Sequence, residues 1–125
     1  WDVVGDGGAW PYPQESADHS QTWLRDPASG HHHLDVFREP HVDDHWVCRR
    51  DPSITLPYSE LILHTRTGIP YLAPEVVLLF KAKHLRPKDQ TDFAQLSPAL
   101  DSERRSRLRD WLGRVHPGHQ WIAEL

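Results

Sequence analysis

Three histidines and an aspartate, residue types capable of metal binding or acid–base chemistry, lie close together between His31 and Asp35. In an extended strand, residues two apart share one face, so His31, His33 and Asp35 are predicted to point the same way. Two imidazoles and a carboxylate suit a transition-metal ion, whereas a carboxylate joined by acids from elsewhere suits Mg²⁺. A solvated strand face is the alternative for the histidines. Asp35 differs, because a carboxylate between Leu34 and Val36 of a buried strand is costly without a partner.

A second charged group follows the apolar run 76–80 and contains Lys83, Lys88, Asp89 and Asp92. Lysine is a point-charge partner for phosphate, and an adjacent acid can orient it or take a proton from a hydroxyl. The alternative is an ordinary solvated helix with pairs four residues apart, such as Lys88 with Asp92. Both interpretations remain open on the residues alone.

Short strands are predicted to position the first group. Residues 1–4, 22–25, 32–37 and 45–49 alternate or are rich in aromatic and β-branched side chains, and turn residues separate them. Residues 58–68 fit either a strand or a short amphipathic helix.

Helices are predicted to position the second group. Pro74 suits the first position of a helix that we expect to reach about Leu85 and to break at Pro87. Asp101 is expected to cap a second helix, whose apolar residues recur at helical spacing: Leu108, Trp111, Leu112 and Val115. Strands first and helices last predict an α+β fold, with the C-terminal helices packed on a mixed or antiparallel sheet. We expect one domain over residues 1–125, strand-rich over 1–65 and helical over 73–116.

Composition narrows the possible partners. The chain of 125 residues has a formal net charge of −4, which argues against a general nucleic-acid binder. No apolar run reaches the ~20 residues of a membrane span. The one cysteine, Cys48, allows no internal disulfide and is expected to be buried, which fits a cytoplasmic protein. The sequence has no methionine, and we expect it to be a fragment or a processed product of a longer protein.

Four segments within residues 31–125 resemble, in order, bacterial nucleotidyltransferase-fold proteins of the aminoglycoside adenylyltransferase type. The segments are "LDVF", "WVCRRDPSITLP", "GIPYLAPEVVLLFKAKHLRPKDQTDF" and "LDSERRSRLRDWLGRVHPGHQWIAEL". The resemblance implies a mixed sheet flanked by helices, binding of ATP or another nucleoside triphosphate with Mg²⁺, and transfer of the nucleotidyl group to a small-molecule hydroxyl. The expected partners are therefore a nucleotide and a small-molecule substrate, with no membrane and no nucleic acid.

The resemblance also assigns roles to individual residues. Asp35 matches the third carboxylate of such a site, as a metal-side ligand or as the base that activates the acceptor. Lys83, Lys88 and Asp89 match the lysine-rich helix and the "PKD" turn, where they would support the triphosphate or the walls of the site. The family's Asp-x-Asp signature is expected before residue 1. A non-catalytic binding domain of the same fold is one alternative, and a transition-metal protein that uses His31, His33 and Asp35 is another.

Overall fold

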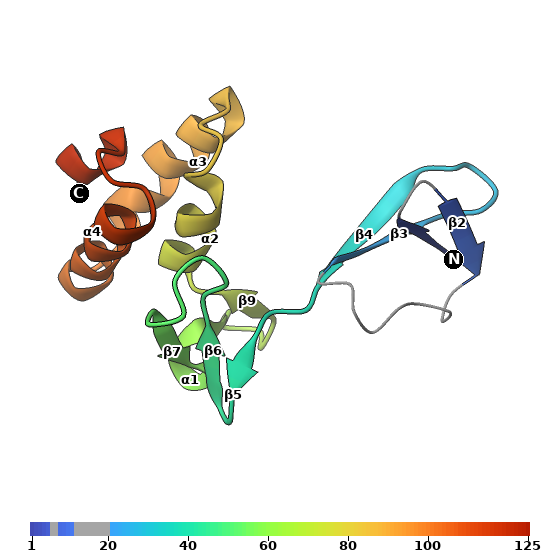
Figure 1. Cartoon of the computed structure of the whole chain (residues 1–125), viewed down its shortest axis with the longest axis horizontal. Coiled ribbons are helices and arrows are strands. Elements are labelled where there is room, and N and C mark those ends of the chain that lie inside the picture. The colour runs from blue at the N-terminus through green and yellow to red at the C-terminus, as the bar shows by residue number, and fades with distance from the viewer. Residues whose placement is uncertain (6–7, 12–20) are drawn as a thin grey trace. The chain divides into compact units, whose positions relative to one another are not determined.

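The computed structural model describes residues 1–5, 8–11 and 21–125. These residues form two compact units, residues 1–40 and residues 41–125 (Figure 1). Each unit is described by itself below.

The first unit contains a four-stranded antiparallel sheet. Its strands are β1 (Asp2–Gly5), β2 (Gly8–Pro11), β3 (Gln21–Arg25) and β4 (His32–Phe37). Their order in the sheet is β2-β1-β3-β4, with β4 at one edge of the described strands. The strands predicted over 1–4, 22–25 and 32–37 are therefore confirmed, with small differences at the ends. One face of the sheet is buried through Val3, Thr22 and Leu24.

The burial predicted for β4 is wrong. All six residues of this strand are exposed, including Leu34 at 53% and Val36 at 41%. The alternating pattern of the sequence gives the direction of each side chain, but an edge strand has a neighbour on one side only. A carboxylate at Asp35 is therefore solvated, and its charge requires no buried partner.

Small antiparallel sheets open the second unit. β5 (His41–Val42), β6 (His45–Val47) and β7 (Thr55–Pro57) form a three-stranded sheet in that order. The ambiguous segment 58–68 contains both kinds of structure. A one-turn helix, α1 (Tyr58–Leu61), leads directly into β8 (Ile62–His64), which pairs with β9 (Pro70–Leu72) as a hairpin.

The rest of the second unit is helical. The elements are α2 (Pro74–Lys81), α3 (Pro87–Leu96), the 3₁₀ turn η1 (Ser97–Ala99), α4 (Ser102–Val115) and the 3₁₀ turn η2 (Gln120–Ala123). Asp101 caps α4 as predicted, because its Oδ1 accepts the backbone N–H of Arg104 at 2.8 Å. The helix predicted from Pro74 to about Leu85 ends earlier, at Lys81. Pro87 starts α3, since a proline is also favourable at the first position of a helix.

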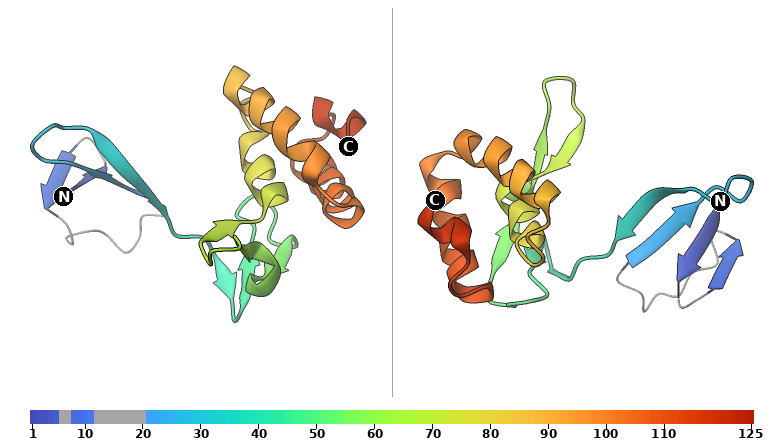
Figure 2. Two further views of the ribbon diagram at one scale, coloured as in Figure 1. Left: turned by 180° about the vertical axis from the view of Figure 1, so that it is seen from behind. Right: turned by 90° about the horizontal axis from the view of Figure 1, so that it is seen from above.

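The helices and the three-stranded sheet share one hydrophobic core. Figure 2 shows α2, α3 and α4 gathered side by side. Trp46 of β6 packs edge-on against Phe80 of α2 and contacts Trp111 of α4, with ring centroids 6.0 and 6.3 Å apart. Cys48 is free and fully buried in this core, as expected. The fold is therefore α+β with antiparallel sheets, and the helices pack on the small sheet β5-β6-β7.

Among the helices of the described ranges, none has the length and apolar character that a membrane crossing requires.

Candidate functional site

Asp35 lies in the middle of β4 and lines an open pocket of about 400 Å³. Trp23, His32, His33 and Leu34 line the same pocket. Both carboxylate oxygens of Asp35 accept hydrogen bonds from the side-chain amide of Gln21, at 2.9 and 2.8 Å. Gln21 lies on β3, beside Trp23, which is the residue opposite Asp35 in the register of the two strands. The strand pairing therefore holds the carboxylate in one orientation next to an exposed indole ring.

The structure does not assemble His31, His33 and Asp35 into a set of metal ligands. His31 precedes β4, and the register between β3 and β4 shifts between Leu24 and Arg25, which interrupts the two-residue alternation near His33. The His33 ring instead contacts Trp1 edge-on, with centroids 5.5 Å apart. In the part of the chain that the structure describes, no group of three or more His, Cys, Asp or Glu side chains lies close enough to hold a metal ion.

Asp35 also lacks the additional oxygen ligands that a magnesium ion needs. Mg²⁺ prefers octahedral coordination by several oxygen atoms and is usually held by one or two carboxylates together with waters and phosphate groups. Over residues 1–5, 8–11 and 21–125, the pocket offers it the carboxylate of Asp35 alone. These residues therefore do not form a complete magnesium site.

Lys83 and Lys88 are exposed on the second unit. Lys83 follows the end of α2, and Lys88 is the second residue of α3. Their ammonium groups are therefore accessible to an anionic ligand in solvent, as the prediction for these two residues requires.

The contacts of Asp89 give this residue a structural role. Its side chain is fully buried at the third position of α3. One carboxylate oxygen, Oδ2, accepts the Arg86 backbone N–H at 3.2 Å and the Arg86 Nε–H at 2.7 Å. Hydrogen bonds from Arg86 are the main cause that lowers the pKa of Asp89 to about 2, and the positive charge of Lys81 contributes further. The position predicted to support a ligand thus holds together the first turn of a helix.

Lys81, which is not among the predicted site residues, completes this cluster. Its Nζ lies 2.7 Å from Asp92 Oδ2 and 3.5 Å from Asp89 Oδ1. The pair expected between Lys88 and Asp92 is not formed, because Asp92 turns toward Lys81 of the neighbouring helix. The hydrogen bond to Asp92 is also the main cause that raises the pKa of Lys81. Spacing rules for single helices describe pairs within a helix, so they give no signal for this contact across the α2–α3 corner.

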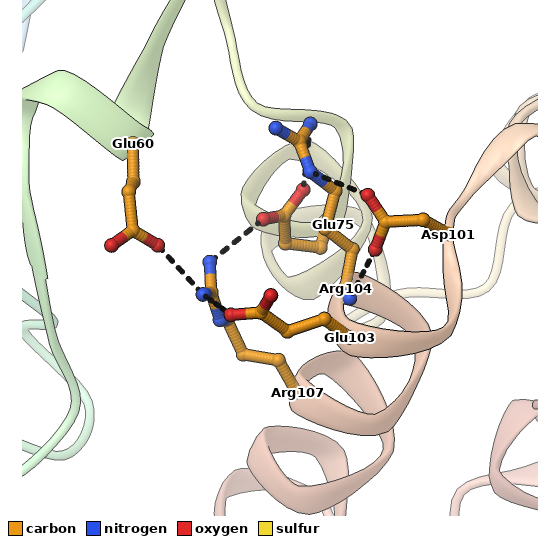
Figure 3. A network of polar contacts seen from close by, with 6 residues as sticks. All are labelled: Glu60, Glu75, Asp101, Glu103, Arg104 and Arg107. Carbon is orange, nitrogen blue, oxygen red and sulfur yellow. Dashed lines mark hydrogen bonds and ion pairs between the residues drawn. The ribbon is translucent and has the colours of Figure 1, made fainter.

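A second missed cluster surrounds Glu75 (Figure 3). Glu75 is fully buried at the second position of α2. Its Oε1 accepts a hydrogen bond from Arg107 Nη1 at 3.2 Å, while its Oε2 lies 3.9 Å from Arg104 Nη1 and has no hydrogen-bond partner. Arg107 Nη2 also donates to Glu60 at 2.7 Å and to Glu103 at 2.9 Å. Arg107 therefore links α1, α2 and α4.

The sequence contains a usable signal for the Glu75 cluster. An acid in the first turn of an apolar helix, with two arginines three residues apart on a later amphipathic helix, is compatible with a pair between the helices. The positive N-terminal end of α2 favours an acid at this position. The structure shows that guanidinium groups balance its charge as well.

The predicted site residues belong to different units. Asp35 lies in residues 1–40, whereas Lys83, Lys88 and Asp89 lie in residues 41–125. Comparison with known proteins adds no family: no protein-family model matches the chain, and no match was found among curated proteins or solved structures.

Proposed function

We propose that this protein takes part in the transfer of a nucleotidyl group, such as adenylyl from ATP, to a hydroxyl of a small molecule of the aminoglycoside type. The observation that carries the proposal is the position of Asp35. This residue was assigned from the resemblance of its sequence segment, and it lines an open pocket with an exposed aromatic ring beside it. A carboxylate in such a position can accept a proton from a bound hydroxyl group.

Each predicted residue receives a role within its own unit. Asp35 is the proposed base for the acceptor hydroxyl, and Gln21 positions it through two hydrogen bonds. Lys83 and Lys88 are proposed to attract the phosphate groups of the nucleotide, because both are exposed cations. Asp89 acts indirectly, by fixing the start of α3 on which Lys88 lies.

In this proposal, Mg²⁺ arrives bound to the phosphate groups of the nucleotide. Mg²⁺ bound with a nucleoside triphosphate neutralises charge on the phosphates during transfer. Asp35 can contribute one carboxylate to such an ion, and the remaining ligands would have to come from the nucleotide, from water or from outside the described residues.

Calorimetry and product release test the proposal together. The purified chain is titrated with MgATP, and the release of pyrophosphate is then followed with and without an aminoglycoside acceptor. We expect MgATP to bind and Asp35→Ala to lower the acceptor-dependent rate by about 10²- to 10⁴-fold, the usual contribution of a general base. Asp43→Asn is the matched control: it removes one exposed carboxylate, and asparagine tolerates the positive φ of 50° at this position.

Two results would overturn the enzymatic proposal. One is the absence of MgATP binding, and the other is an equal transfer rate in Asp35→Ala and in Asp43→Asn.

A non-catalytic binding domain is the second candidate, and one observation favours it. Both carboxylate oxygens of Asp35 already accept hydrogen bonds from the Gln21 amide. MgATP binding without acceptor-dependent release of pyrophosphate would support this second function over the first.

A further inference from the structure

Arg50 is an exposed cation that three neighbours hold in place. It follows β6 in the loop before β7. Its Nη1 donates to the carbonyl oxygen of Leu79 at 3.2 Å and lies 3.3 Å from Nε2 of His116. Its guanidinium carbon lies 5.8 Å from the centre of the Phe80 ring. Within the described residues, Nε and Nη2 of this exposed arginine have no hydrogen-bond partner, so these donors are available to a ligand.

His116 adds an imidazole ring to the same place. It caps the C-terminal end of α4 and is partly buried. Burial is the main cause that lowers its pKa, followed by electrostatic interactions with Arg50, His119 and Lys83. Because Arg50 donates to Nε2, the neutral imidazole carries its proton on Nδ1. Lys83 directly follows Ala82, whose carbonyl oxygen lies 3.1 Å from Nε2 of His119, so its backbone lies near the same group.

His119 lies next to His116 and is also partly buried. Its ring centroid is 6.1 Å from that of His116. Nε2 lies 3.1 Å from the carbonyl oxygen of Ala82, to which it donates, and Nδ1 accepts the backbone N–H of Trp121 at 3.1 Å. Both nitrogens are therefore used, and His119 is neutral when these bonds are formed. His119 therefore packs beside His116 but offers no free N–H donor to a ligand.

The carboxylate next to Arg50 in the sequence binds other residues. Asp51, the neighbour of Arg50 in sequence, accepts hydrogen bonds from Ser53 and pairs with Arg114 at 2.9 Å. Among the described residues, no carboxylate forms an ion pair with Arg50 or Lys83. The chain has a net charge of −4, yet Arg50 and Lys83 place two cations near the partly buried imidazole of His116. Such convergence repels itself and is relieved when an anion binds.

We infer that Arg50, Lys83 and His116 form a binding site for an oxyanion of the phosphate class. A guanidinium with free donors, an ammonium and an imidazole supply hydrogen bonds from different directions to a tetrahedral anion. Bound phosphate adds the negative charge that favours the imidazolium form of His116 and gives Nε2–H an acceptor in place of the Arg50 donor. Binding and protonation of His116 are therefore coupled.

This inference deepens the proposed function, since it gives Lys83 two partners for a phosphate group of the nucleotide. To that extent it rests on the proposed function. Binding of inorganic phosphate does not rest on it, so the two are tested separately.

Nuclear magnetic resonance of the His116 imidazole tests the site in the whole chain, with inorganic phosphate as the probe. Phosphate is expected to shift the His116 resonances in a saturable way and to raise the pKa of this ring. Lys83→Gln and Arg50→Gln are each expected to weaken phosphate binding about tenfold, the loss of one charge-assisted hydrogen bond. Arg66→Gln removes an exposed cation in the β8–β9 turn and is the control, which should bind phosphate as the wild-type chain does.

Lys83→Gln is the decisive variant, because Arg50 also packs on Phe80 and its loss could disturb the fold. The inference is overturned if phosphate causes no saturable shift at His116, or if Lys83→Gln and Arg66→Gln bind it equally well. Neither result bears on the transfer of a nucleotidyl group from Asp35, and failure of MgATP binding would leave a demonstrated phosphate site intact.

Discussion

Glu75 is a buried carboxylate that depends on arginines from another helix. Removing one partner of a buried ion pair leaves an uncompensated charge and costs about 3–5 kcal/mol, whereas replacing both partners is often close to neutral. Arg107 contacts Glu75 directly, while Arg104 is more distant at 3.9 Å. The stability of the cluster therefore rests mainly on Arg107.

Arg107→Gln is predicted to lower the free energy of unfolding by about 3 kcal/mol, because Glu75 would keep its charge in the interior. The double variant Glu75→Gln with Arg107→Gln should recover most of this loss. Urea unfolding followed by circular dichroism measures both. Arg109→Gln, on an exposed position of the same helix, is the control and should change stability little. Equal effects of the changes at Arg107 and Arg109 would contradict the prediction.

At the scale of elements, η2 is joined to the helices by one histidine and one tryptophan. Trp121 is fully buried and stacks on Phe93 of α3, with ring centroids 4.3 Å apart. Its Nε1–H donates to Gln90 at 2.8 Å. His119 connects this turn to the end of α2 through the carbonyl oxygen of Ala82. Protonation of His119 would remove the acceptor that holds the Trp121 backbone N–H.

Burial lowers the pKa of His119 and of His116 below the ordinary value of 6.5. The unfolded chain therefore takes up protons first as the pH falls through about 6.5, and stability present above that pH is lost below it. His119→Gln is predicted to reduce this loss between about pH 7.5 and 5.5, since glutamine can donate and accept without titrating in this range. Urea midpoints at both pH values measure the effect.

His64→Gln supplies the comparison for this test, because His64 is exposed on β8. It should keep the wild-type loss of stability at acidic pH. A pH dependence that is unchanged in His119→Gln would show that the buried imidazole does not contribute to acid sensitivity.

At the scale of the whole molecule, the larger unit has its own core. The hydrophobic cluster that contains Trp46, Leu79 and Leu112 is built entirely from residues between 46 and 125. We therefore predict that residues 41–125 fold when produced alone and unfold in one cooperative step. Near-ultraviolet circular dichroism and a urea titration measure this. A spectrum without tertiary signal, or a transition without cooperativity, would contradict it.

Local sequence patterns account for much of this fold. Alternation predicted β3 and β4, and the N-cap at Asp101 predicted the start of α4, because these signals depend on neighbouring residues only. Exposure of β4 was not predictable in this way, since it depends on which strands pair beside it. Pro87 predicts a helix end, but a proline equally suits the first position of a helix, which is its place in α3.

The candidate sites were harder to predict than the elements. Lys81 contacts Asp92 across a corner, and His116 meets Arg50 from a segment 66 residues away. Spacing along one element carries no information about such pairs. Asp35 is a candidate through the resemblance of its sequence segment, whereas its place opposite Trp23 and its hydrogen bonds to Gln21 depend on the register of β3 against β4.

The six tryptophans divide between the two units in a way that gives the chain its own optical reporters. Trp46, Trp111 and Trp121 are buried in residues 41–125, whereas in residues 1–40 Trp1 and Trp23 are exposed at 55% and 46% and Trp10 is half-buried. Indole emission shifts to longer wavelength in water, and aqueous quenchers reach exposed rings first. Intrinsic fluorescence therefore separates a change at the Asp35 pocket, beside Trp23, from a change in the packing of the helical unit.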